Sequence, residues 1–256
     1  TGALQPLPDI VALARQHGTF VILDAVTSLG GVPLSIDATG IDICYSGTQK
    51  CIGAPPGLAP ITASAGAVEA ISRRERPPVS FTFDLTLLEA YWGTRRAYHH
   101  TAPISAVYAL REALRLLLAE GLDSRAARHR RVASQLHLGA SGLGLQCLVD
   151  ERHRLPMLTT FVVPDGVDDK VVRGRLLTEH NIEIGGGLGP LAGKVWRVGL
   201  MGHSAREENV ARFLTADLDQ VVTPGSGRHR FPRVDACHRD DLRALELRVN
   251  AVFDVG

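Results

Sequence analysis

A lysine occupies an unusual place at residue 50. It ends the stretch Tyr45-Ser-Gly-Thr-Gln-Lys50, directly after an apolar run (41–45) and before a loop rich in glycine and proline (53–60). Lysine side chains usually lie along helix surfaces with the ammonium group in water. Of the 28 basic residues, only Lys50, Lys170 and Lys194 are lysines, and the other 25 are arginines. Because lysine can lose its proton in the physiological range and arginine cannot, a lysine at a strand end predicts a site that needs a nucleophilic amine.

A carboxylate could meet that amine at the same edge of a sheet. The apolar run 19–23 is a predicted buried strand that ends at Asp24, and 41–45 is a second such strand. Ligands of open α/β sheets bind outside the carboxyl ends of the strands, so Asp24 and Lys50 share a cleft if their strands are neighbours. An amine and a carboxylate suit an aldehyde cofactor with a basic ring nitrogen, because one forms a Schiff base and the other keeps the ring protonated. A buried Asp–Lys ion pair, or an aspartate that caps a helix, explains the same residues without catalysis.

Arg197 is the third candidate. It is the one cation in the apolar stretch Val195-Trp-Arg-Val-Gly-Leu-Met201. A planar guanidinium binds a carboxylate bidentately, so we expect Arg197 to bind a substrate carboxylate, with a structural role as the alternative. The glycine-rich run 184–194 before it fails as a P-loop, since Leu188 stands where glycine is required and Val195 where serine or threonine is required. We expect this run to be a flexible segment beside the site.

The elements that would position these residues fall into two groups. In the first, strands are predicted at 19–23, 41–45 and 57–63, with helices at 8–17, 65–74 and 103–120. Continuous apolar strands that alternate with helices indicate an α/β fold with a mainly parallel sheet covered on both faces. The second group has helices at 123–138, 168–180 and 204–221, strands at 145–149, 157–163 and 194–200, and a short extended piece at 182–184. This is typical of a smaller α+β domain.

The predicted domains are therefore a large domain at 1–122, a small domain at 123–222 and an irregular tail at 223–256 with one weak helix at 240–253. Four arginines of the 123–138 helix are expected on a solvated face: Arg125, Arg128, Arg130 and Arg131.

Composition narrows the classes of function. The chain has 256 residues, 45% of them hydrophobic and 21% charged, with a formal net charge of +1. This balance provides no electrostatic surface for nucleic acid or for an anionic membrane, and no apolar run approaches the roughly 20 residues of a membrane span. Four scattered cysteines without a C-x-x-C pair (44, 51, 147 and 237) predict reduced thiols in a cytoplasmic protein. Cys51 is expected to pack rather than react, and His99 and His100 lack metal-ligand spacing, so we expect no metal.

Three motifs in order carry a family resemblance: Asp24-Ala-Val-Thr-Ser-Leu-Gly-Gly31, Tyr45-Ser-Gly-Thr-Gln-Lys50 and Tyr98-His-His-Thr-Ala-Pro103. Together they resemble the class V aminotransferases of the fold type I group that uses pyridoxal 5′-phosphate (PLP). Within that family the chain is most similar to alanine–glyoxylate and serine–pyruvate aminotransferases, over about residues 1–221. The resemblance implies transamination between an amino acid such as alanine or serine and a 2-oxo acid such as glyoxylate or pyruvate.

The resemblance also implies a role for each site residue. Lys50 would form the Schiff base and carry the proton between substrate and cofactor, and Asp24 would pair with the pyridine nitrogen. Val26 would pack under the ring, and Gln49 would donate to the phosphate. Tyr98 and Thr101 would reach the phosphate of a partner subunit, so the protein would be a homodimer with shared sites; a core tyrosine and a helix N-cap are the alternatives. Arg197 would bind the substrate α-carboxylate.

Three other functions compete with transamination. A cysteine desulfurase of the same superfamily would have histidine before the lysine and a reactive cysteine on a late loop, but Gln49 precedes the lysine here and Cys237 lies in the tail. A nicotinamide-dependent oxidoreductase would depend on the glycine run rejected above. A non-catalytic remnant that still dimerises is the alternative from a different class.

The chain also departs from the family pattern at both ends. The family's large domain begins before Thr1, in a part that carries a phosphate-binding loop and a ring stacked on the cofactor. The tail after Val222 matches nothing expected there. We therefore expect a truncated chain that is inactive or poorly soluble alone.

Overall fold

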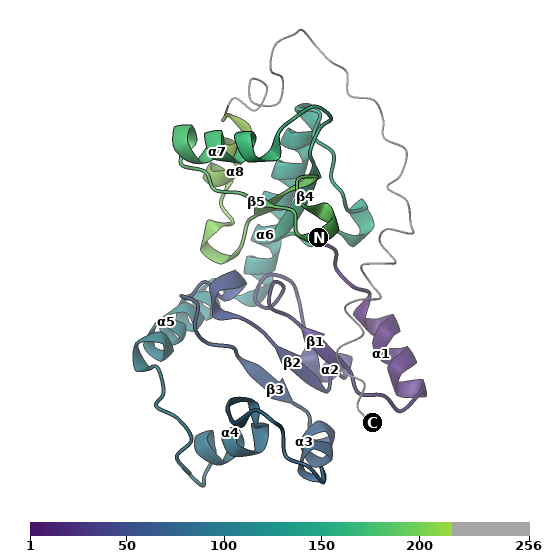
Figure 1. Ribbon diagram of the computed structural model, residues 1–256, viewed down its shortest axis with the longest axis vertical. Coiled ribbons are helices and arrows are strands. Elements are labelled where there is room, and N and C mark those ends of the chain that lie inside the picture. Colours follow the sequence, from purple (N-terminus) through teal and green to yellow (C-terminus); the bar gives the residue numbers. More distant parts are fainter. Residues whose placement is uncertain (217–256) are drawn as a thin grey trace.

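Two small sheets organise the computed structural model, which describes residues 1–216 (Figure 1). The first sheet contains β1 (Ile22–Asp24), β2 (Ile43–Tyr45) and β3 (Ile61–Ala63) in that order. β1 and β2 are parallel, whereas β2 and β3 are antiparallel. The described sheet is therefore mixed, and the prediction of a mainly parallel sheet was wrong for it. The loop after β2 returns as a hairpin, because Ser46 N donates to Pro60 O and Thr48 N donates to Leu58 O.

The helices of this part of the chain are α1 (Leu7–Gln16), α2 (Ile36–Thr39), α3 (Ala65–Ser72), α4 (Leu85–Trp92) and α5 (Ile104–Glu120). One face of the sheet is covered by α1. Val11 of α1 packs with Ala25, Ile41 and Cys44 on the covered face. The opposite face carries Ile22, Asp24, Tyr45 and Ile61, since paired residues of neighbouring strands point the same way. Ile22 and Ile61 are each 49% exposed, so the predicted burial on both faces is not observed here.

The second sheet is antiparallel throughout and has the order β4-β6-β5. Its strands are β4 (Leu158–Val162), β5 (Gly185–Gly186) and β6 (Val195–Gly199), and its helices are α6 (Leu122–Gly142), α7 (Asp169–His180) and α8 (Glu207–Leu214). Five short helical turns complete residues 1–216: η1 (Thr48–Ile52), η2 (Phe81–Phe83), η3 (Glu151–His153), η4 (Gly189–Leu191) and η5 (Gly202–Ser204).

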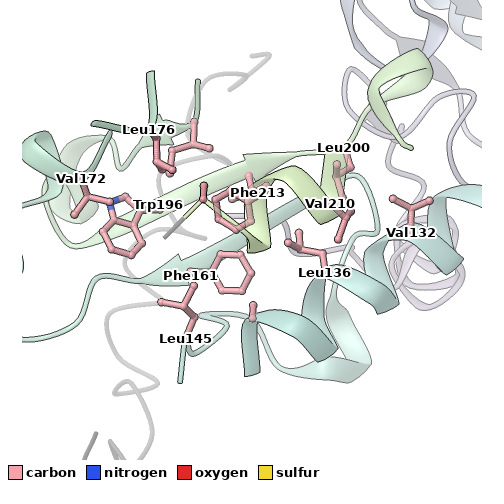
Figure 2. Packing of buried hydrophobic residues seen from close by; sticks show 14 of the residues in the cluster. Val132, Leu136, Leu145, Phe161, Val172, Leu176, Trp196, Leu200, Val210 and Phe213 are labelled. Atoms are coloured by element: carbon pink, nitrogen blue, oxygen red, sulfur yellow. The ribbon is translucent and has the colours of Figure 1, made fainter. Parts of the chain in front are cut away.

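The most extensive core lies between α6 and the second sheet (Figure 2). Val132, Leu136 and Ala140 recur on one face of α6 at helical spacing and have no exposed surface. They pack against Phe161 of β4 and, through α8, against Phe213. Figure 2 shows Leu136 and Val210 converging between α6 and α8. This core fixes the orientation of the strand that carries Arg197.

The first residues of the chain contact the second sheet. Ala3 forms an antiparallel bridge with Arg154, and Gly2 accepts a hydrogen bond from Leu155 N. Gly2 has a φ of +77°, and a Cβ there would lie 2.1 Å from the Leu158 carbonyl oxygen, so only glycine fits. Figure 1 accordingly places the N-terminus beside the β4–β5 region. Gly2 and Ala3 belong to the proposed large domain (1–122) but contact residues 154–158 of the proposed small domain. The domain boundary at residue 122 remains a proposal.

Most predicted elements are confirmed at slightly different bounds. The predicted strand 145–149 is reduced to a bridge between Cys147 and Phe161, and the sequence did not predict α2 or α4. The predicted helix 204–221 is observed as Glu207–Leu214. The tail 223–256 with its weak helix lies outside the described residues. No helix within residues 1–216 is long and apolar enough to cross a membrane.

Leu136→Ala should lower the free energy of unfolding by about 2–5 kcal/mol, because it opens a cavity at a side chain with no exposed surface. Leu138, two residues on and 78% exposed, provides the matched control, and Leu138→Ala should change the free energy by about 0.5 kcal/mol or less. Urea denaturation of both variants measures the difference. Equal losses would show that the α6 core is not packed as described.

Candidate functional site

The parallel pairing of β1 and β2 sets the first part of the site. Asp24 lies opposite Tyr45 at the ends of the two strands, and its Oδ1 accepts a hydrogen bond of 2.8 Å from Val26 N. Asp24 is exposed, so it is not half of a buried ion pair. Burial first, and then the neighbouring Asp24 carboxylate, raise the pKa of Tyr45. Tyr45 is thus a neighbour of the carboxylate that the sequence did not single out.

A cavity of about 250 Å³ lies beside Asp24. Its wall includes Thr27 and Ser28 from the turn after β1, together with Thr1 and Leu158. Burial, followed by the charge of Arg197, lowers the pKa of the Thr1 amine. Thr1 therefore lines the Asp24 cavity and lies close enough to Arg197 to be affected by its charge.

Lys50 lies in the loop that follows β2. Buried Ser46 donates from Oγ to Ala25 O, which ties the ends of β1 and β2 together. Buried Thr48 donates from Oγ1 to Pro55 O at 2.6 Å and begins the π-helical turn η1. Lys50 interrupts that turn, with φ −93° and ψ −128°. Such π turns recur at functional sites, and here the turn presents the half-buried Lys50 side chain just beyond the strand end.

Val26 and Gln49 meet around Gly47. A Cβ at Gly47 would lie 2.8 Å from Gln49 Oε1 and 3.5 Å from Val26 Cγ1. Glycine at this position therefore lets the two side chains approach each other at the start of the lysine loop. The structure thus brings Asp24, Val26, Gln49 and Lys50 to one edge of the sheet.

Arg197 is half-buried in the middle of β6. Its Nε donates to Gly186 O at 2.7 Å, and a Cβ on Gly185 would lie 3.4 Å from its guanidinium nitrogens. The Nε bond fixes the plane of the guanidinium and leaves its outer nitrogens to bind a ligand. Gly186 belongs to the glycine-rich run 184–194, which was predicted to be a flexible segment. Part of this run forms strand β5, and its Gly186 carbonyl holds the Arg197 guanidinium.

Tyr98 and Thr101 contact each other, with 3.1 Å between Tyr98 Oη and Thr101 Oγ1. Tyr98 is 79% exposed, so it is not a core residue, and Pro103 rather than Thr101 precedes α5 as the N-cap. Both structural alternatives are therefore wrong. Among residues 1–216, no hydrogen bond or ring contact joins this pair to Asp24, Val26, Gln49 or Lys50 within the chain.

Sequence reasoning placed Arg125 and Arg128 on a solvated face, and the structure contradicts this. Arg125 is 6% exposed and donates to Cys51 O, to Gly30 O and to Glu120. Arg128 donates to Glu120 and to Gly202 O and Ala205 O. By contrast, Arg130 and Arg131 are exposed, as predicted.

The spacing of residues along α6 could have predicted that Arg125 is buried. Arg125 and His129 precede Val132, Leu136 and Ala140 at intervals of three or four, so they share the core face of the helix.

Cys51 is fully buried, and its Sγ donates to Thr27 O at 3.2 Å. Burial raises the pKa of its thiol to about 11. A thiol that is protonated and inaccessible packs rather than reacts, in agreement with the sequence-based expectation.

The fold is that of the fold type I aminotransferases, and the chain belongs to the class-V aminotransferase family, whose model matches residues 1–213. It is 40% identical over 240 residues to the (S)-ureidoglycine–glyoxylate transaminase of Bacillus subtilis, covering 87% of this chain and 58% of that protein. It is 44% identical over 220 residues to the alanine–glyoxylate aminotransferase of Oryctolagus cuniculus, covering 84% and 56%. The crystal structure of alanine–glyoxylate aminotransferase from Nostoc sp. superimposes with a TM-score of 0.84 at 51% identity, covering 87% of this chain and 59% of that chain.

The chain thus spans a little over half the length of these relatives. A cysteine desulfurase from Thermococcus onnurineus shares only the fold, at 16% identity and a TM-score of 0.68.

The free energy of unfolding should depend on pH through the ionisation of Glu120. Hydrogen bonds from Arg128 first, and also from Arg125, lower the pKa of Glu120 from 4.5 to about 2. A lowered folded-state pKa stabilises the fold above the unfolded value of 4.5, and this contribution is lost as the pH falls from 4.5 toward 2. Over that range the free energy of unfolding should fall more steeply for the wild type than for Glu120→Gln. Urea denaturation at a series of pH values checks this, and parallel curves would contradict it.

Proposed function

We propose that the protein is a PLP-dependent aminotransferase that exchanges an amino group between an amino acid and a 2-oxo acid. The observation that carries this proposal is the meeting of a carboxylate and an amine-bearing loop at one sheet edge. Asp24 ends β1, and the Lys50 loop follows β2, its parallel neighbour. Family membership supports the same reaction class.

The chain's residues fit the cofactor in their chemistry. Bound PLP supplies an aldehyde that amines attack and a protonated ring that withdraws electrons. Asp24, exposed at the cavity, would hold the ring nitrogen protonated. Lys50 Nζ would be the point of covalent attachment and would then move a proton at the substrate Cα. Val26 would lie against the ring, and Gln49 would donate to the phosphate.

Arg197 would orient the substrate. Its guanidinium plane is fixed by Gly186 O, so its remaining donors can bind an α-carboxylate bidentately. Alanine or serine as donor and glyoxylate or pyruvate as acceptor are the proposed substrates. Support comes from the relatives, whose names specify alanine or (S)-ureidoglycine with glyoxylate.

A homodimer with shared sites is the proposed assembly. Large apolar side chains that are each at least 61% exposed gather within residues 79–108: Val79, Phe83, Trp92, Tyr98, Ile104 and Tyr108. Exposed apolar side chains in such number indicate a protein interface. Tyr98 and Thr101 lie in this region and would reach the partner's phosphate site. The proposed compartment is the cytoplasm, which the free thiols of Cys44, Cys51 and Cys147 support.

Lys50 should carry the cofactor. After limiting PLP and borohydride, peptide mapping of the complete gene product should find the pyridoxyl group on Lys50, because it is the lysine at the strand end. Lys50→Arg should abolish this label and the conversion of L-alanine and glyoxylate to pyruvate and glycine, since arginine keeps the charge but cannot attack. Lys194→Arg, at an exposed position, is the matched control and should behave as the wild type. A label elsewhere, or none, would favour the non-catalytic alternative.

Shared sites can be tested by mixing two inactive chains. One chain carries Lys50→Ala and the other carries Tyr98→Phe with Thr101→Ala. If the pair serves the partner's site, a mixed dimer contains one site with both parts intact, and statistical mixing restores about a quarter of the sites. Activity at limiting PLP measures the recovery. No recovery would assign Tyr98 and Thr101 to their own subunit or to a structural role.

A further inference from the structure

A buried cation remains that the proposed chemistry does not use. Arg125 is 6% exposed, and it lies near the start of α6, outside all three motifs of the sequence. Burying a guanidinium is costly unless its donors are all matched. The atoms that match it therefore indicate what it holds in place.

Two of those atoms are backbone carbonyls from the site. Arg125 Nη2 donates to Cys51 O at 2.6 Å and Nε donates to Gly30 O at 3.0 Å. Cys51 follows Lys50 directly, and Gly30 lies in the turn that begins after Asp24. On its other side the guanidinium donates from Nη1 to Oε2 of Glu120 at 2.6 Å. One planar group thus bridges the lysine loop and the turn after the aspartate strand.

The turn η5, which follows β6, lies close to the same loop. Gly202 of η5 has a φ of +58°, and a Cβ there would lie 3.0 Å from Cys51 O and 3.2 Å from Lys50 O. Gly202 N donates to His129 Nε2 at 3.0 Å, and His129 Nδ1 lies 2.8 Å from Arg125 O. Because Nε2 accepts, Nδ1 carries the proton and the imidazole is neutral. Arg128 closes the network by donating to Gly202 O and to Glu120.

We propose that Arg125 is a positioning residue for Lys50: its guanidinium clamps the Cys51 and Gly30 carbonyls, and so fixes the lysine loop against the Asp24 turn. This inference deepens the proposed function and rests on it for the role of Lys50. The clamp needs a fork, since a lysine ammonium cannot reach two divergent carbonyls and Glu120 in the same geometry. A displacement of 1 Å at a reacting group can reduce its rate about 100-fold.

The first test uses hydrogen exchange in the complete gene product without cofactor. The amides of Gly53 and Ala54 donate to Lys50 O and Thr48 O, so they report on the loop. In Arg125→Lys and Arg125→Gln they should exchange at least about tenfold faster, since the carbonyl anchor is lost. The strand β4 should keep its wild-type protection. Arg130→Lys and Arg130→Gln, at an exposed position on the same helix, should leave both segments within about twofold of the wild type.

The second test follows Lys50 itself. Attachment of PLP, measured by absorbance and borohydride mapping, should be about 10- to 100-fold slower in Arg125→Lys than in Arg130→Lys. The pH midpoint of the attached cofactor's absorbance should shift in Arg125→Lys alone, because that midpoint depends on the surroundings of the Lys50 nitrogen.

Three results would overturn the proposal. The first is that the Gly53 and Ala54 amides exchange in Arg125→Lys as they do in the wild type. The second is that Arg125→Lys attaches PLP at the wild-type rate and keeps the wild-type absorbance midpoint. The third is that β4 loses as much protection as the loop, which would show that Arg125 stabilises the fold in general. If the wild type carries no label on Lys50, the proposed function fails instead, and the exchange comparison still decides whether the clamp exists.

Discussion

The parallel pairing of β1 with β2 is the constraint on which the rest of the site depends. Parallel strands end at the same edge of a sheet, so the pairing brings the Asp24 carboxylate and the Lys50 loop together although 25 residues separate them. Ser46 reinforces this edge by donating to Ala25 O. The open face of the sheet follows from the same register, because Asp24, Tyr45 and Ile22 all point to it. A carboxylate that meets a ligand must lie on such a face, whereas Cys44, one residue before Tyr45, points into the covered core.

The local sequence predicted the individual site residues better than it predicted how the strands that carry them pair. Lys50, Asp24 and Arg197 could be proposed because each is a charged residue at the end or in the middle of an apolar strand, which is a local signal. The pairing of β3 was predicted wrongly, since the hairpin return of residues 46–60 depends on Thr48 and Ser46 bonding to the far end of the loop. Strand direction depends on such contacts between distant residues, which no run of apolar residues reveals.

The arginines of α6 give a second example of what the sequence alone could not predict. Counting charges predicted a solvated face, while the spacing of Arg125 and His129 with Leu136 predicts a buried one. The spacing was the better signal, because a helix face is buried as a unit. Which acceptors would match the buried guanidinium could not be predicted, since they are backbone carbonyls of Gly30 and Cys51, about 95 and 74 residues away in sequence. Backbone acceptors are present at every residue and carry no sequence signature.

The presence of a lysine at position 50, in a chain with 25 arginines and three lysines, then has a physical reason. The proposed function needs three kinds of cation: an amine that can lose its proton, a planar group that binds a carboxylate, and a planar group that holds backbone in place. Arginine is suited to the last two because its donors are fixed in one plane and always charged. At Arg197 one edge of the plane is used by Gly186 O and the other stays available. At Arg125 each of the three guanidinium nitrogens donates to a partner within the chain. In the proposed function a lysine is needed at position 50, where a mobile amine is useful only if the backbone beneath it does not move.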